Sequence, residues 1–149
     1  MLGWIWPLAW FGCEEACEER ASLQLALGET LEGVWASLPA DGPRLTRGSQ
    51  GGQHFTLAVY VDGLGAAPAP FELTLEAEAD LGDGWMPIGG WSRPFEDPRK
   101  RRDLAPVELL DLLVVVDPDP ILGSRRFTAR IEDGCGRHAD HTFMTKDQP

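Results

Sequence analysis

Hydrophobic and polar residues alternate along most of the chain after residue 20, and this period of two predicts β-strands. The clearest run is His54–Asp62, in which Phe55, Leu57, Val59 and Val61 share one face. Further alternating runs are Ser22–Leu27, Phe71–Ala79, Arg126–Glu132 and Arg137–Thr145. Each run offers one face to a core and the other to water, as strands of antiparallel sheets do.

Other segments carry weaker patterns. Leu112–Val116 is a continuous, valine-rich apolar run, which predicts a strand buried on both faces. The residues before it, Val107–Asp111, leave open the alternative of a helical turn. Two shorter strands are expected near Pro43–Arg47 and Trp85–Ile88.

Segments rich in glycine and proline separate these runs, and such residues favour turns. They are GSQGG (48–52), GLGAAPAP (63–70), DPDP (117–120) and DGCG (133–136). The chain has 149 residues, which fits one domain. We therefore predict an all-β fold in residues 21–146, an immunoglobulin-like β-sandwich of seven or eight antiparallel strands with Greek-key connections. Residues 147–149 are expected to form a disordered tail.

The N-terminus differs from the rest of the chain. Residues 1–12, MLGWIWPLAWFG, contain no charged side chain, are too short to span a bilayer and match the apolar core of a secretory signal peptide. Cys13 follows, and residues 13–20 form an acidic tether. This order predicts a bacterial lipoprotein signal with lipidation at Cys13.

The match to such a signal has departures. Trp10 and Phe11 stand where a lipoprotein signal has leucine and a small residue, and a basic n-region is missing. The alternative is an apolar tail on a cytosolic protein, which would be an aggregation liability. We expect export to the cell envelope as an outer-membrane or periplasmic lipoprotein, with the membrane reached through an N-terminal lipid anchor.

Cysteine usage agrees with export. The chain has three cysteines, so lipidation of Cys13 leaves Cys17 and Cys135 as a pair. We predict a disulfide between them, since exported domains commonly carry such bonds. The rival interpretation of CEEAC as half of a metal site is weaker, because a zinc site needs a second pair of ligands.

The formal net charge is −11, from 24 acidic and 13 basic residues. Nucleic acid is therefore not an expected partner, because binding to phosphates needs a basic face.

Three stretches together resemble a family of uncharacterised bacterial lipoproteins with an immunoglobulin-like fold. They are Ser22–Leu27, GSQGGQHFTLAVYVDGL (48–64) and FTARIEDGCGRHADHTF (127–143). The resemblance covers roughly half of the chain and leaves out residues 81–106. It implies a fold and an envelope location, and it carries no activity or functional residue.

The segment outside the resemblance holds the candidate binding residues. Trp85, Trp91 and Phe95 lie in GWMPIGGWSRPF, a segment interpreted as a loop. Such aromatics can stack on sugars, contact a protein, or cover an open end of the core. A basic cluster follows, consisting of Arg99, Lys100, Arg101 and Arg102. This cluster is either a solvated loop or a docking patch for an anionic partner.

Catalytic motifs are missing from the sequence. His138 and Asp140 would share a strand face, with His141 on the other, so at most two of them could bind one metal. We therefore expect a non-catalytic, envelope-tethered domain with a binding or structural role, no cofactor, and a protein or glycan partner. The alternatives are a carbohydrate-binding module that uses exposed tryptophans and, last, a metal-dependent hydrolase.

Overall fold

A computed structural model provides the structure of the chain and describes residues 22–49, 51–64, 70–95, 106–116 and 123–145. The expected signal peptide, tether and C-terminal tail lie outside the described residues. The same is true of Cys13, Cys17 and the basic cluster at Arg99, Lys100, Arg101 and Arg102. In the described ranges, no helix is long and apolar enough to cross a membrane.

The described residues form nine strands. Their bounds are β1 Gln24–Leu31, β2 Val34–Ser37, β3 Leu45–Arg47, β4 Gln53–Asp62, β5 Phe71–Asp80, β6 Trp85–Phe95, β7 Val107–Val116, β8 Arg125–Glu132 and β9 His138–Met144.

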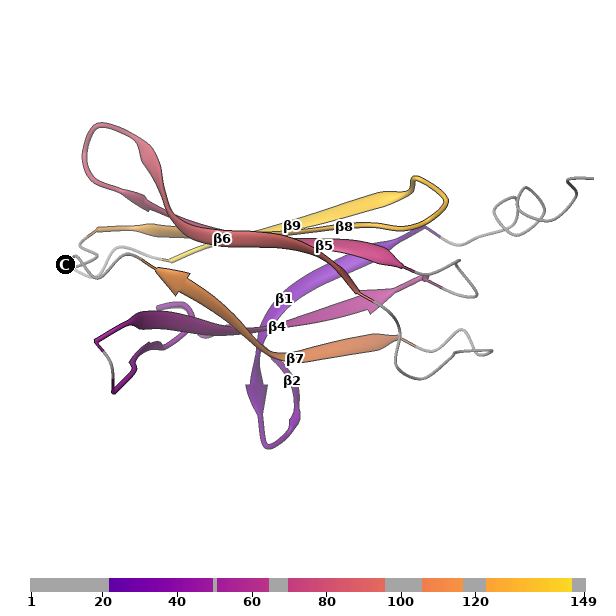
Figure 1. Ribbon diagram of the computed structural model, residues 1–149, viewed down its shortest axis with the longest axis horizontal. Coiled ribbons are helices and arrows are strands. Elements are labelled where there is room, and N and C mark those ends of the chain that lie inside the picture. The colour runs from indigo at the N-terminus through magenta and orange to yellow at the C-terminus, as the bar shows by residue number, and fades with distance from the viewer. Residues whose placement is uncertain (1–21, 50, 65–69, 96–105, 117–122, 146–149) are drawn as a thin grey trace, which may run out of the picture.

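The strands form one hydrogen-bonded sheet that curls into two layers (Figure 1). The first layer has the order β2-β1-β4-β7, with β3 paired to β4 beside β1. The second layer has the order β6-β5-β8-β9. At one side the layers are joined by a single paired position, Gly89 with Val116. At the other side the backbone N–H of Leu27 on β1 donates to Nδ1 of His141 on β9 at 3.2 Å.

This order is that of an immunoglobulin-like sandwich. Strands β1, β4 and β7 lie side by side in one layer, and β5, β8 and β9 lie side by side in the other, as A-B-E and C-F-G do in that fold. The chain crosses between layers after β4, β6 and β7, while β5–β6 and β8–β9 are hairpins. The predicted all-β, antiparallel sandwich with Greek-key connections is confirmed, with nine described strands instead of seven or eight.

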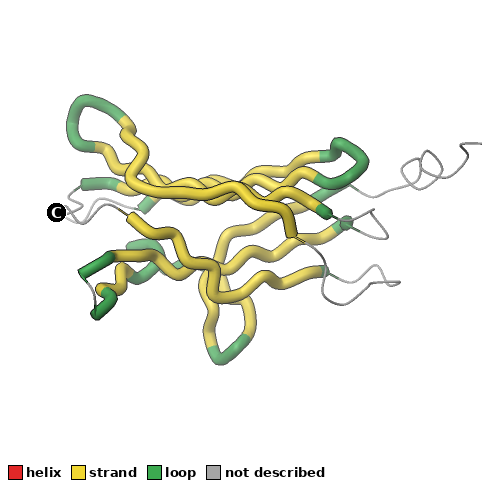
Figure 2. Tube along the Cα trace, in the orientation of Figure 1, coloured by secondary structure: helices red, strands yellow, loops and turns green. Residues whose placement is uncertain are grey.

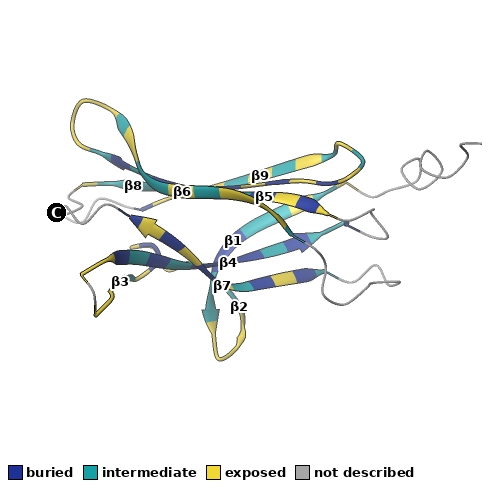
Figure 3. Cartoon of the chain, in the orientation of Figure 1, coloured by how far each residue is buried: buried dark blue, intermediate teal, exposed yellow. Residues whose placement is uncertain are grey.

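The core lies between the layers and follows the predicted alternation (Figure 3). Every odd-numbered residue of β5 is buried, and Phe55, Leu57, Val59 and Val61 of β4 face them. Phe55 and Phe127 are fully buried and meet edge to face, with their ring centroids 4.9 Å apart. Burial of each such aromatic side chain contributes about 2–3 kcal/mol.

The structure decides the alternative left open for Val107–Asp111 and corrects the expectation for Leu112–Val116. Val107–Asp111 is part of the strand and not a helical turn. Leu112–Val116 is not buried on both faces, because Leu113 and Val115 are 49% and 68% exposed. The core lies on one face of β7 only, where Leu112, Val114 and Val116 are buried, and the valine-rich sequence hides this alternation. A bulge in β7, opposite Ala58 of β4, and a positive φ of 53° at Asp111 mark where the register of the two strands shifts.

The strand expected near Trp85–Ile88 is present but longer than predicted, because it continues to Phe95 through residues interpreted as a loop. It forms β6, which pairs with β5 along nearly its whole length. The prolines and glycines of this segment are compatible with a strand because β6 is bonded to β7 at only one position. The sequence pattern also missed β2, which forms a short hairpin with β1 that projects from the first layer (Figure 2).

Candidate functional site

The outer face of the second layer, which is the side turned away from the core, is a ladder of polar side chains. Successive cross-strand pairs of β5 and β8 carry Glu72–Glu132, Thr74–Arg130, Glu76–Thr128 and Glu78–Arg126. On β6 the partners of Thr74, Glu76 and Glu78 are Ser92, Gly90 and Pro87. Paired residues of antiparallel strands project on the same side, so these side chains form one surface.

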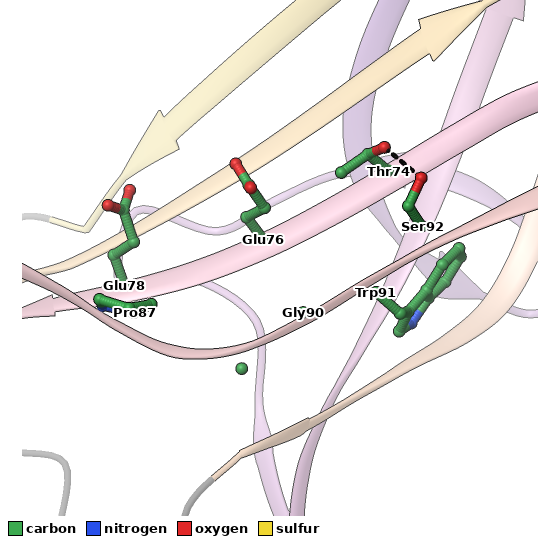
Figure 4. Close-up of a pocket in the computed structure, with 8 residues that line it drawn as sticks. Thr74, Glu76, Glu78, Pro87, Gly90, Trp91 and Ser92 are labelled. Carbon is green, nitrogen blue, oxygen red and sulfur yellow. Dashed lines mark hydrogen bonds between the residues drawn. The ribbon is translucent and has the colours of Figure 1, made fainter.

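A hollow of about 440 Å³ lies on this surface, and we name it the β5–β6 groove. It is lined by Thr74, Glu76, Glu78, Pro87, Gly89, Gly90, Trp91 and Ser92 (Figure 4). The hollow exists because Gly90 places no side chain opposite Glu76. Its volume falls within the range of small-molecule sites.

Both glycines are required by close backbone approaches. A Cβ atom at Gly90 would lie 2.7 Å from the carbonyl oxygen of Leu75, and one at Gly89 would lie 2.3 Å from that of Val115. A register shift between Ala77 and Glu78 accompanies this stretch. The floor of the groove is therefore set by the backbone and is formed without a ligand.

One end of the groove carries an ion pair. Arg126 donates from Nε and Nη2 to the two carboxylate oxygens of Glu78, at 2.5 and 2.8 Å. The guanidinium hydrogen-bonded to Glu78 holds the pKa of that carboxyl below its ordinary value. Reciprocally, the hydrogen bond to Glu78 raises the pKa of Arg126, with smaller contributions from the charges of Glu78 and Glu76.

The centre of the groove holds Glu76, which is exposed. Within the part of the chain that the structure describes, its carboxylate makes no hydrogen bond and no ion pair. On either side of it lie Gly90, which has no side chain, and Thr128.

At the other end of the groove, hydroxyls form a short chain. The hydroxyls of Thr74 and Ser92 are 2.7 Å apart, and Ser92 Oγ donates to Glu72 Oε1 at 2.6 Å. A smaller hollow of about 160 Å³ is lined by Thr74, Glu76, Thr128 and Arg130. Because it shares Thr74 and Glu76 with the β5–β6 groove, the concave surface continues from β6 across β5 to β8.

The predicted aromatic residues are divided between two sides of β6. Trp85 pairs with Asp80 on the outer face, and the guanidinium of Arg126 lies 4.7 Å from its ring centroid. Trp91 pairs with the buried Leu75 and is directed to the other side of the strand (Figure 4). Trp85 and Trp91 therefore do not form a shared flat platform.

Trp91 and Phe95 instead pack against the core, as the core-covering alternative predicted. Their ring centroids are 6.2 Å apart, and Phe95 stacks on Phe71 at 6.1 Å. The guanidinium carbon of Arg93 lies 4.1 Å from the Trp91 centroid and 4.9 Å from that of Phe95. This cluster covers the side of the sandwich where β6 and β7 separate.

The predicted histidine geometry is confirmed. His138 and Asp140 are exposed on the outer face of β9, while His141 faces inward and accepts the Leu27 N–H. Among the described residues, no three His, Cys, Asp or Glu side chains are grouped so that they could hold a metal ion.

The turn between β8 and β9 contains a buried carboxylate that sequence reasoning did not single out. The side chain of Asp133 is 0% exposed and accepts the backbone N–H groups of Cys135 and Arg137. Arg137 donates from Nε and Nη2 to Asp133 Oδ2, and from Nη2 to the carbonyl oxygen of Gly63. Gly63 in turn contacts Ser22, since a Cβ atom there would lie 2.5 Å from the Ser22 carbonyl oxygen. The start of the described chain thus lies beside the turn that holds Cys135.

Comparison of the chain with protein-family models, curated proteins and solved structures returned no match. The resemblance to a lipoprotein family therefore stays a prediction.

Proposed function

We propose that this protein is a non-catalytic binding domain, tethered to the bacterial cell envelope, that contacts its partner through the outer face of the second layer. The observation that carries this assignment is the β5–β6 groove, a preformed hollow with the unpaired carboxylate of Glu76 at its centre. Loops of a sandwich vary freely, but a hollow fixed by strand backbones holds its shape before the ligand arrives. Preorganisation of that kind lowers the cost of binding.

The outer face of the first layer is the competing surface. It presents Leu113 and Val115, which are exposed apolar residues on β7. We favour the second layer because it combines concavity with polar groups that can orient a ligand. The carbohydrate-binding alternative based on Trp85 and Trp91 loses its main support, because these rings lie on opposite sides of β6.

We also propose that Cys13 carries the lipid anchor and that Cys17 and Cys135 form a disulfide. The position of Ser22 supports the second part, because it lies near the β8–β9 turn by way of Gly63 and Arg137. Residues 17–22 can span up to ~17 Å when extended, which sets the reach of Cys17 from Ser22.

Intact-mass spectrometry of protein from fractionated cells tests the tether. The expected product begins at Cys13 and carries added lipid mass. Before reduction it should be two mass units lighter than after reduction, since one disulfide removes two hydrogens. Substitution Cys13→Ser should leave the protein unlipidated. Unprocessed full-length chain in the cytosol would contradict the proposal.

Site-specific photo-crosslinking in intact cells tests the binding face. A photoreactive amino acid is placed at Thr142, an exposed residue on the outer face of β9, or at Val115 on the outer face of β7. We expect crosslinked products from Thr142 and none from Val115. Products from Val115 alone would assign binding to the first layer instead.

A further inference from the structure

We infer that the β5–β6 groove receives the cationic side chain of a lysine or arginine from an extended segment of a protein partner. The inference rests on the proposed function, which places binding on this face, and it adds the chemistry of the ligand. It follows from the space in the groove, from the charge state of its lining, and from the charge of the whole chain.

The space in the groove lies where the residue of β6 paired with Glu76 has no side chain. Gly90 lies between Ser92 and Pro87 on the groove side of β6, and the residue paired with it is Glu76. A side chain from another molecule can enter the groove beside Gly90, where β6 presents no side chain. Since a Cβ atom at Gly90 would lie 2.7 Å from the Leu75 carbonyl oxygen, the protein itself cannot readily fill the position.

The charge at the centre of the groove is the carboxylate of Glu76, and the rows on either side of it carry Arg126 and Arg130 on β8. Arg126, the cation of the neighbouring row, is engaged by both carboxylate oxygens of Glu78. Glu76 has no ion pair among the described residues, so an incoming cation would meet it without displacing an internal partner. The pair Thr74–Ser92 adds hydroxyl oxygens at the side. An ammonium group has three donors and a guanidinium five, which a carboxylate with adjacent hydroxyls can accept.

The chain as a whole also favours a basic partner. Its formal net charge of −11 attracts cationic molecules and raises their encounter rate at low ionic strength. A sugar ligand would instead use an aromatic face. The Trp91 ring is directed to the other side of β6. The Trp85 ring lies on the outer face, but the guanidinium of Arg126 occupies a position 4.7 Å from its centroid.

Titration of the ¹⁵N-labelled full chain followed by amide NMR tests the inference. The probe is Nα-acetyl-lysine methylamide, and the matched neutral probe is Nα-acetyl-norleucine methylamide. We expect the lysine probe alone to shift the amide signals of Gly89, Gly90 and Thr74, with an affinity that falls as salt rises. Equal shifts with the norleucine probe would overturn the inference.

Two glutamate-to-glutamine variants distinguish the effect of the Glu76 charge from the effect of the total negative charge on the outer face. Glu76→Gln should weaken binding of the lysine probe at least tenfold. Glu132→Gln removes the same charge from the same face. Glu132 lies four residues along β8 from Thr128, the residue paired with Glu76, so the two positions on β8 are about 13 Å apart. This variant should bind within a factor of two of the wild type. Equal binding by Glu76→Gln and the wild type would contradict the inference.

A third variant supplies a cation from the protein itself to the carboxylate of Glu76. Thr128→Lys places an ammonium group on β8 directly opposite Glu76. It should keep the circular dichroism spectrum of the wild type and lose binding of the lysine probe. Retained binding in this folded variant would overturn the inference. A neutral disaccharide that shifts the same amides while lysine does not would also overturn it, yet would leave the binding face of the proposed function intact.

Discussion

The indole nitrogen of Trp91 donates a hydrogen bond to the carbonyl oxygen of Leu113 at 2.7 Å, which links β6 of the second layer to β7 of the first. The only paired position between these strands is Gly89 with Val116. Trp91 therefore closes the open side of the sandwich and satisfies a carbonyl group that a strand margin would otherwise present to other chains.

Substitution Trp91→Phe should lower the free energy of unfolding by about 1 kcal/mol, because it removes the indole donor while retaining an aromatic ring. Urea denaturation followed by circular dichroism measures the change. Trp85→Phe serves as the control and should change the free energy of unfolding by less than about 0.5 kcal/mol, as surface substitutions usually do. Equal effects of the two substitutions would argue against a closing role for Trp91.

The ion pair of Glu78 and Arg126 predicts how stability depends on pH. The pKa of Glu78 in the folded protein lies below its ordinary value of 4.5, so the folded state binds this proton less readily than the unfolded state does. The resulting stabilisation is present above pH 4.5 and is lost as the pH falls through the lower pKa of the folded state.

Glu78→Gln should therefore reduce the free energy of unfolding at pH 7 and should flatten its decline below pH 4.5. Denaturant titrations at a series of pH values measure this difference. Glu132→Gln, on the same face and outside this ion pair, provides the comparison. If both variants followed the wild-type pH profile, the ion pair would not contribute to acid stability.

The buried carboxylate of Asp133 should be essential to the β8–β9 turn. Asp133→Ala leaves two backbone N–H groups and the Arg137 guanidinium without this acceptor, and should cost about 3 kcal/mol of stability. Asp140→Ala, at an exposed position of β9, should change the stability by less than about 0.5 kcal/mol. Thermal unfolding of the three proteins distinguishes them, and a small loss in Asp133→Ala would show that the turn forms without its carboxylate.

Much of the fold could be predicted because β4, β5, β8 and β9 lie with one face on the core and the other in water. Their alternation is visible residue by residue, as in the buried odd positions of β5. The sequence-based prediction was wrong where pairing with a neighbouring strand, and not the local sequence, determines the secondary structure. The sequence predicts a strand near Trp85–Ile88, but the glycines and the proline that follow suggest a loop, and it is pairing with β5 that extends the strand to Phe95.

The candidate site was harder to predict. Trp91 and Phe95 have the composition of a binding surface, yet they cover the core. Glu76 looks like any exposed glutamate of a strand. Its proposed role in binding depends on its pairing with Gly90. That pairing is set by the register of β5 and β6, which contains a bulge that the sequence does not reveal. The pair Gly89–Gly90, directly after a predicted short strand, was the available signal, since glycines in strands often mark a bulge or a close backbone approach.

The central claim, that the groove around Glu76 is the binding site of this domain, is tested most directly by photo-crosslinking from Thr142 in cells that carry the Glu76→Gln substitution. Thr142 lies in the same cross-strand row as Glu76, two strands away, so the photoreactive group reports on the site without filling it. The account predicts that Glu76→Gln reduces the crosslinked product at least tenfold, while Glu132→Gln leaves it unchanged. An undiminished product in the Glu76→Gln cells would contradict it.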